Sequence, residues 1–169
     1  MTYSLEALAD DCRNALRDGE SDAALEQVRQ CVERALKDSE FLNTHILNRP
    51  TQPERNVIYE DPTLGFCVCA HVYGTAKPGD PHDHGPTWAI YGQAEGETEM
   101  TDWRVVEPAS DESPARVEKT RTYTLRPGDA HTYATGAIHA PIRYGATRLL
   151  RIEGTNTDRV QRTPMVAAD

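Results

Sequence analysis

The sequence predicts an all-β barrel or sandwich preceded by a helical segment, and two observations support this prediction. Residues 1–48 of the 169-residue chain carry apolar side chains at spacings of three and four, which is typical of amphipathic helices. From residue 55 onward the chain consists of short runs rich in β-branched and aromatic residues, separated by Gly, Pro and Asp. Many short strands joined by turns favour a barrel or a sandwich.

The helical segment divides into three parts. The first helix is indicated by one apolar stripe, made of Leu5, Leu8, Cys12 and Leu16. Gly19 is a plausible end for it, and Ser21 can cap a second helix. That second helix carries Leu25, Val28, Val32 and Leu36. A short third helical piece holds Phe41, Leu42, Ile46 and Leu47, after which the prolines of `NRPTQP` break the pattern.

The expected strands follow in order, as `RNVIYE`, `GFCVCAHVY`, `TWAIYGQ`, `ETEMTDWRVV`, `ARVEKTRTYTL`, `HTYA`, `APIRYG` and `TRLLRIEG`. Between two of them, `VEPASDESPA` is polar and contains proline, so we expect an exposed loop. The chain length suits one domain, with a helical segment over 1–48, a barrel over 55–155 and a tail over 156–169. Nothing in the tail sequence predicts an anchor for it.

Composition and charge exclude several classes of function. No apolar run approaches the roughly 20 residues that a membrane span needs. The net charge of −9 and the lack of a basic stripe argue against nucleic-acid binding. The first residues show no signal-peptide pattern, and the four cysteines form no Cys-x-x-Cys pair. Reduced thiols and a cytoplasmic location are therefore expected.

The histidines of `PGDPHDHGPTWAIYG` form the first candidate site. If this stretch enters a strand, His82 and His84 point to the same face and can bind one metal side by side. A His-x-His pair alone is weak evidence for a metal site, because two polar histidines on a surface turn explain the same pattern equally well. A second stretch, `TGAIHAP`, places His139 three residues after Gly136, where another strand can bring it inward.

Together these two stretches resemble the two sequence motifs of the cupin superfamily, whose fold is a jelly-roll barrel, the double-stranded β-helix. The resemblance implies that His82, His84 and His139 are metal ligands. Many cupins add a glutamate ligand where this chain has Trp88 and Ala89, neither of which can bind a metal. Three neutral imidazoles would leave a divalent ion with its +2 charge, which attracts an anionic substrate. Iron is the favoured ion, although imidazole also suits zinc, copper and nickel.

Within the cupins, the three-histidine pattern is similar to that of the thiol dioxygenases, the cysteine dioxygenase family. The order of the parts agrees, and `ETEMTDW` resembles a pattern that follows the first motif in that family. The resemblance implies that Arg55, on the first strand, pairs with a substrate carboxylate. A guanidinium fork suits that role. The alternative is a surface arginine paired with Glu54 or Glu60.

Two departures from the family pattern concern the substrate pocket. In the animal enzymes, a cysteine just after the second ligand forms a cross-link to a tyrosine. Ala89 occupies that region of this chain, so no such cross-link can form. The family also has a Ser-His-Tyr set on a late strand, and `TRLLRIEG` contains neither His nor Tyr. Arg151 and Glu153 share one face of this strand, and the sequence leaves open whether that face is inward. Tyr133 and Tyr144 are candidate replacements for the missing phenol.

The remaining histidines have structural explanations. His71 shares a strand face with Cys67, Cys69 and Tyr73, which fits a second metal cluster but fits a packed, hydrogen-bonded face better. We expect His131 at a turn or a pocket rim and His45 in a structural position in the helical segment. Trp88 and Trp103 are expected in the core or in a pocket wall.

The sequence thus predicts a mononuclear non-haem iron dioxygenase, with Fe(II) as cofactor and O2 as co-substrate. It would oxidise a small anionic substrate, a thiol carboxylate, to the sulfinate, with Arg55, Tyr133 and Arg151 as candidate catalytic residues. A metal-dependent lyase, isomerase or carbon–carbon-cleaving dioxygenase is one alternative, and a ligand-binding protein without catalysis is another. The small molecule is the expected partner, and a homodimer is compatible with the sequence.

Overall fold

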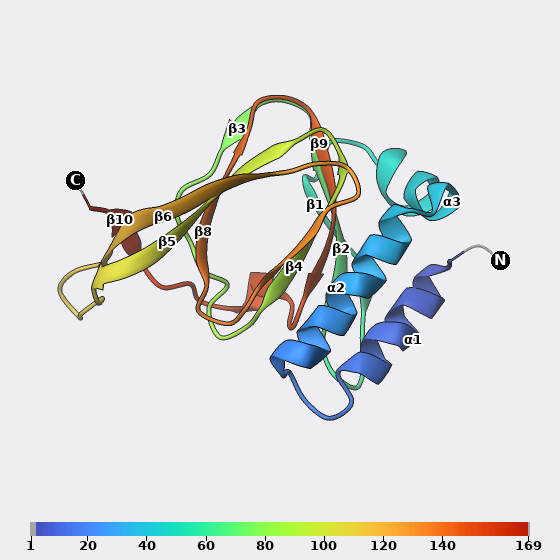
Figure 1. The fold of residues 1–169 in the computed structure, drawn as a ribbon, viewed down its shortest axis with the longest axis horizontal. Helices are drawn as coiled ribbons and strands as arrows, with labels where there is room; N and C mark the ends of the chain where they lie inside the picture. The colour runs from blue at the N-terminus through green and yellow to red at the C-terminus, as the bar shows by residue number, and fades with distance from the viewer. Residues whose placement is uncertain (1–2, 169) are drawn as a thin grey trace.

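The helical segment lies at one side of the molecule in the computed structural model, which describes residues 3–168 (Figure 1). It comprises α1 (Leu5–Ala15), α2 (Asp22–Leu36), α3 (Ser39–Leu42) and the π-helical turn η1 (Asn43–Leu47). Ser21 caps α2 as predicted, since its hydroxyl accepts a hydrogen bond from the Ala24 amide at 3.2 Å. No helix within residues 3–168 is long and apolar enough to cross a membrane.

The rest of the chain forms two five-stranded sheets. The strands are β1 (Arg55–Glu60), β2 (Cys67–Tyr73), β3 (Lys77–Pro78), β4 (Ala89–Glu95), β5 (Thr98–Glu107), β6 (Ala115–Leu125), β7 (Ala130–Tyr133), β8 (Ile138–Arg143), β9 (Thr147–Glu153) and β10 (Met165–Ala167). The first sheet has the order β1-β2-β9-β4-β7 and the second the order β10-β6-β5-β8-β3. A short 3₁₀ turn, η2 (Thr157–Arg159), follows β9. The predicted jelly-roll barrel with an N-terminal helical segment is confirmed.

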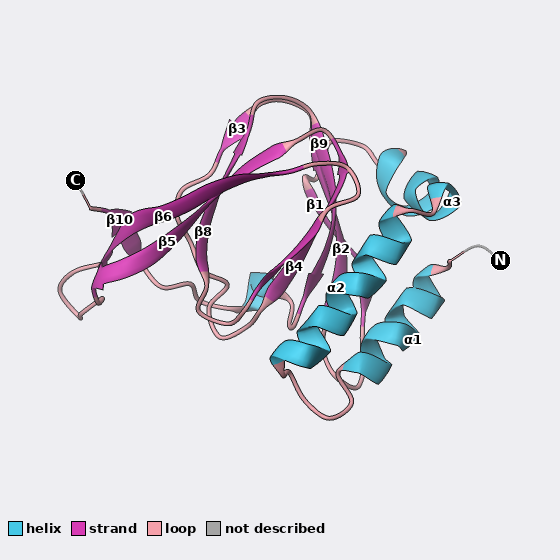
Figure 2. Cartoon of the chain, in the orientation of Figure 1, coloured by secondary structure: helices cyan, strands magenta, loops and turns pink. Residues whose placement is uncertain are grey.

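The helices cover the outer face of the first sheet (Figure 2). Strand alternation separates two apolar clusters. On β9, Leu150 and Ile152 pack toward the helices in the larger cluster, whereas Leu149 belongs to a second cluster inside the barrel. The same alternation puts Arg151 and Glu153 on the inner face with Leu149, which answers the question that the sequence left open.

Helix α2 and strand β4 approach each other closely at Gly92. A Cβ atom at Gly92 would lie 2.5 Å from Cγ1 of Val32 and 3.1 Å from the carbonyl oxygen of Leu150. Any larger side chain would therefore push α2 away from the sheet. This contact holds the helical layer against the strand that leaves the histidine motif.

The expectation of an unanchored tail is wrong. Strand β10 pairs in parallel with the start of β6, with Met165 opposite Ala115. Before it, the amide of Thr163 donates a hydrogen bond to the buried carboxylate of Asp83 at 3.1 Å. The anchor is a set of backbone contacts to distant strands, which the local composition of the tail does not report.

Shortening Leu150 tests the contact between helices and barrel. Leu150 is fully buried in the larger apolar cluster, so Leu150→Ala should lower the free energy of unfolding by about 2–5 kcal/mol. Urea denaturation of both proteins measures the change. Val105→Ala is the control, because Val105 is 48% exposed and should alter stability by less than about 0.5 kcal/mol. A loss at Leu150 as small as the control would contradict the proposed packing.

Candidate metal centre

The two histidine motifs meet through their backbones. His82 and His139 form an isolated antiparallel bridge, in which each amide donates to the other's carbonyl oxygen at 3.0 Å. His139 lies on β8, while His82 belongs to the segment between β3 and β4. These reciprocal hydrogen bonds hold the first motif against the second without any contribution from a metal.

His82 and His84 do not lie on a regular strand, so strand alternation is not what brings their side chains together. Pro81 and Pro86 lack amide donors, and Gly85 takes a positive φ of 62°, so the ladder stops after His82. The carboxylate of Asp83 instead accepts the Gly85 amide at 3.0 Å and turns the chain into β4. The extended backbone nevertheless directs both imidazoles to one side.

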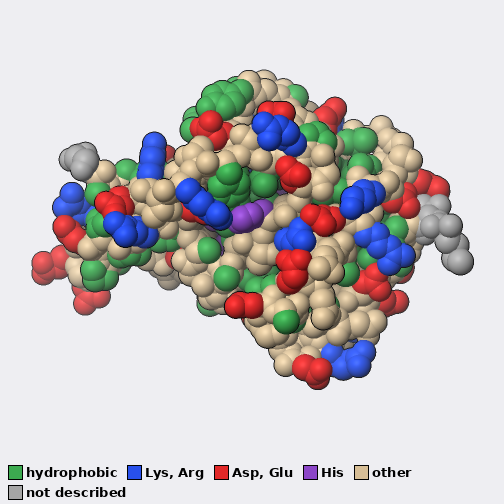
Figure 3. Space-filling view, viewed as in Figure 1, with side chains coloured by type: hydrophobic (Ala, Val, Ile, Leu, Met, Phe, Trp, Pro, Cys, Tyr) green, Lys and Arg blue, Asp and Glu red, His purple; other side chains and the backbone are tan. Residues whose placement is uncertain are grey.

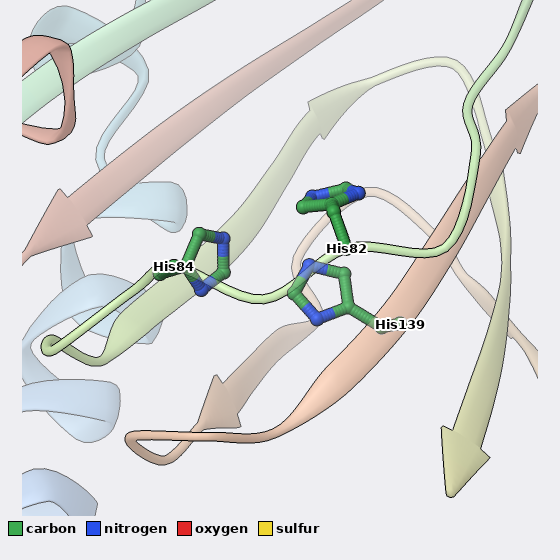
Figure 4. A group of neighbouring side chains, drawn as sticks. All are labelled: His82, His84 and His139. Carbon is green, nitrogen blue, oxygen red and sulfur yellow. The ribbon is translucent and has the colours of Figure 1, made fainter. Parts of the chain in front are cut away.

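The three imidazoles gather around a common space (Figure 4). Each offers a ring nitrogen, and these ligand atoms all lie within 4.8 Å of one another. The ring centroids of His82 and His139 are 4.6 Å apart, and those of His84 and His139 are 4.8 Å apart. His84 and His139 are buried, and His82 is partly exposed. Nitrogen ligands this close can bind one transition-metal ion.

The protonation of these histidines suits metal binding. The Nδ1 atom of His82 donates to the carbonyl oxygen of Asp80 at 2.8 Å, which leaves its Nε2 lone pair free. Burial lowers the pKa of His82 to about 4 and holds those of His84 and His139 well below their ordinary value. All three rings are therefore neutral at pH 7, as metal ligands must be.

Tyr91 completes the group, and the sequence did not point to it. Its hydroxyl lies 3.0 Å from Nε2 of His84 and 3.1 Å from Nε2 of His139. One hydroxyl proton can serve only one of these nitrogens at a time. In addition, the buried Nδ1 atoms of His84 and His139 have no hydrogen-bond partner within residues 3–168. Each neutral imidazole has one N–H and one lone pair, so the single Tyr91 proton leaves at least one of the two lone pairs without a donor, and a metal ion could bind there.

A cavity of about 430 Å³ opens beside these residues and includes His82 and Tyr91 in its wall. In the space-filling view a histidine side chain is visible in a hollow, with Lys or Arg side chains next to it (Figure 3). The cationic residues of the wall are Arg55, Lys77, Arg143, Arg151 and Arg162. Its carboxylates are those of Glu54, Asp80 and Asp158. A pocket of this size beside a metal site suits a small ligand.

Arg55 lies in the cavity wall, but its guanidinium is held by carboxylates of the chain. Nη2 lies 2.7 Å from Oε2 of Glu153, and Nη1 lies 2.6 Å from Oδ2 of Asp158. Neither Glu54 nor Glu60 is its partner. Burial alone would raise the pKa of Glu153, but Arg151 and Arg55 outweigh it and hold the pKa below its usual value.

Arg151 lies in the same wall, with its guanidinium 4.4 Å above the ring of Tyr91. Arg143 has the same arrangement on Tyr73, at 4.0 Å. Both arginines are 6% exposed. Stacking on an aromatic face stabilises a cation while its N–H edges stay open for a planar anion.

The two other tyrosines suggested by the sequence lie elsewhere. Tyr133 stacks on His139 at a centroid distance of 3.9 Å, and its hydroxyl pairs with that of Tyr123 at 2.8 Å. Tyr144 is 72% exposed and its hydroxyl donates to Glu99. Tyr91 is therefore the phenol that the structure places at the histidine nitrogens.

A second group of ligand types lies nearby on β2 and β9. The ligand atoms of Cys69, His71 and Glu153 lie within 4.8 Å of one another, and all three residues are buried. His71 also contacts the hydroxyl of Tyr73 through Nδ1 at 3.1 Å. Burial raises the pKa of the Cys69 thiol to about 12, and Arg55 lies beside Glu153. A neutral thiol and a neighbouring guanidinium make this group a poor place for a cation.

The other singled-out side chains have packing roles. His45 lies in η1 against Phe41, with ring centroids 4.9 Å apart. His131 lies on β7, half-buried against Tyr123, and not at a turn. Trp88 is fully buried beneath the helices as expected, and Trp103 is half-buried with Lys119 over its ring.

Strand alternation in the sequence could have identified Tyr91 and Arg143 as residues that face the cavity. Tyr91 lies two residues after Ala89 on the same face of β4, and Arg143 lies four residues after His139 on the same face of β8. A period of two starting from an inward-facing residue places both side chains in the barrel.

Comparisons with known proteins show similarity at the level of the fold. No protein-family model and no curated protein sequence matches the chain. Among solved structures, the cupin domain of Cnp3 from Schizosaccharomyces pombe aligns with a TM-score of 0.48 and 11% identity over 65% of this chain and 71% of that one. KdgF from a Halomonas species aligns with a TM-score of 0.47 and 14% identity over 69% and 99% of the two chains. The DMSP lyase DddQ from Ruegeria pomeroyi aligns with a TM-score of 0.46 and 15% identity over 65% and 50%.

Proposed function

We propose that the chain is a metal-dependent cupin enzyme, a mononuclear iron dioxygenase that oxidises a small thiol carboxylate to its sulfinate. One observation carries the proposal: three neutral imidazoles converge at a cavity whose wall is rich in arginine. Ferrous iron held by His82, His84 and His139 would supply the redox chemistry with O2 and a position for the substrate sulfur. Both oxygen atoms of O2 enter the sulfinate, so the reaction needs no further reductant.

The protein contributes binding, orientation and a proton donor. The cationic wall attracts the anionic substrate and fixes its acidic end, so the reacting end is held at the histidine group. The Tyr91 hydroxyl lies where it can hydrogen-bond to a group bound beside His84 and His139. Burial raises the pKa of Tyr91, which keeps the phenol protonated as a donor.

A second candidate function is a metal-dependent lyase or isomerase acting on a small acid. The observation that favours it is the pairing of Arg55 with Glu153 and Asp158, because the arginine that the thiol dioxygenases use for the carboxylate is occupied here. Tyr91 would then be an acid–base group for proton transfer beside a Lewis-acidic metal.

Oxygen uptake separates the two candidates. Protein loaded anaerobically with ferrous iron should consume O2 with thiols that carry a carboxylate, and far less with thiols of the same length that lack one. Sulfinate should form in equal amount to the O2 consumed. One bound iron per chain with no uptake on any thiol would contradict the dioxygenase. Conversion of a small acid without O2 uptake would then support the lyase or isomerase.

A further inference from the structure

The cavity contains two buried arginines that the chain itself does not satisfy. No ion pair and no hydrogen bond of Arg143 is found within the described residues 3–168, and its Nε atom is buried without a partner. In Arg151, Nε lies 3.0 Å from Oε1 of Glu153, but neither atom forms a hydrogen bond there. The Nη2 atom of Arg151 is also buried without a partner in this part of the chain.

Arg55 differs from this pair because both of its Nη groups are hydrogen-bonded, although its Nε atom is also buried without a partner within residues 3–168. Besides the two carboxylates, its Nη2 donates to the side-chain oxygen of Asn156 at 3.1 Å. Glu153 accepts from Arg55 through Oε2, and the same oxygen accepts from the Thr157 amide at 3.2 Å. A substrate carboxylate at Arg55 would have to displace these bonds.

Burial is costly for a cation without a counter-charge, as in Arg143, and for N–H groups without acceptors, as in Arg151, which has Glu153 as its ion-pair partner. An anion that enters the same cavity would remove this cost. Arg143 and Arg151 both line that cavity and each rests on a tyrosine ring that holds it in place. Burial lowers the pKa of Arg143 from its ordinary value, which agrees with a cation that lacks a counter-charge. Exposed Arg162 adds a further positive charge to the wall.

We propose that Arg143 and Arg151, and not Arg55, bind the acidic group of the substrate, with Arg55 as a positioning residue that holds Glu153. The inference rests on the proposed function only for the statement that this cavity is the substrate site. A guanidinium edge matches a carboxylate, which accepts planar, bidentate hydrogen bonds, and both arginines line the same cavity.

The geometry also limits the length of the substrate. Tyr91 has its hydroxyl at the nitrogens of His84 and His139 and its ring face beneath Arg151. A ligand that reaches from the histidine group to Arg151 therefore spans about the length of one phenol ring. The substrate class is a short-chain acid with its carboxylate at one end and its metal-binding group at the other.

Binding of propionate to the metal-free protein tests the proposal without any turnover. Calorimetric titration should show that propionate binds and that the uncharged analogue propionamide does not. Arg143→Gln and Arg151→Gln should each weaken propionate binding at least about tenfold, since each removes a charge-assisted hydrogen bond. Arg104→Gln is the matched control, because Arg104 is an exposed arginine of β5 that pairs with Glu118 and is not part of the cavity wall.

Arg143→Lys and Arg151→Lys are conservative controls, in case the glutamine variants fail to fold. Urea denaturation of every variant checks that it is folded. Lysine keeps the charge without the planar fork, so propionate should bind more weakly than in the wild-type protein but more tightly than in the glutamine variants. Unchanged propionate binding in the arginine variants, or equal binding of propionamide, would overturn the proposal. Propionate binding that depends on both arginines in a protein that takes up no metal would instead refute the proposed function alone.

Discussion

His84→Ala should weaken metal binding by at least about 100-fold. Side chains that merely hydrogen-bond to a metal ligand contribute 10- to 100-fold to affinity, and His84 is itself one of three converging nitrogen donors. The variant and the wild-type protein would be loaded with ferrous iron under anaerobic conditions. Iron per chain after dialysis and competition with a chelator would then measure the affinity.

A matched substitution separates ligand loss from general damage. His45→Ala also removes an imidazole, but His45 packs on Phe41 in the helical segment, far along the chain from the proposed ligands. This control should retain the wild-type iron content. Equal iron affinity in His84→Ala and the wild-type protein would show that the three-histidine assignment is wrong, as would equal losses in both variants.

Glu153→Gln should lower the free energy of unfolding by about 3–5 kcal/mol, because it leaves buried Arg151 and half-buried Arg55 without their shared carboxylate. Glu153 is fully buried and contacts Arg55 and Arg151. Glutamine keeps the size of the side chain, so the effect reports the charge. Urea denaturation at neutral pH measures it. The control, Glu118→Gln, breaks an exposed pair with Arg104 and should cost less than about 1 kcal/mol.

The difference in the free energy of unfolding between the wild-type protein and Glu153→Gln should decrease as the pH falls. The folded protein holds the pKa of Glu153 below its usual value, so the unfolded chain binds more protons than the folded one at acidic pH. The stability that Glu153 contributes is therefore complete above its unfolded pKa of about 4.3 and falls as the pH drops through the folded value. A gap between wild type and Glu153→Gln that stays constant down to pH 2 would contradict a charged Glu153.

The fold and the three proposed ligands were predictable because their signals are local. Apolar spacing marks the helices, and Ser21 marks the start of α2 through a contact three residues away. His82, His84 and His139 stand in two short motifs that need no knowledge of the rest of the chain. The absence of a regular strand at His82 and His84 has an equally local reason, since Gly85 and the flanking Pro81 and Pro86 interrupt the ladder.

The state of the arginines could not be predicted, because it depends on partners distant in the sequence. Arg55 was expected to face a substrate or to pair with a neighbouring glutamate, yet it pairs with Glu153 and Asp158, 98 and 103 residues away. Nothing in the segments around Arg55 and Arg143 distinguishes an occupied guanidinium from an unoccupied one. That difference appears only when β1, β8 and β9 surround the same cavity.

The loop that carries His82 and His84 is held in part by a tail segment that is synthesised after it. A Cβ atom at Gly85 would lie 2.5 Å from the carbonyl oxygen of Gln161, and Asp83 accepts the Thr163 amide. A nascent chain that has emerged only as far as β9 therefore contains all three histidines, but it lacks Gln161 and Thr163, which contact the loop. Metal loading during translation would meet an incompletely held site, and proteolysis beyond β9 would return a finished protein to that condition.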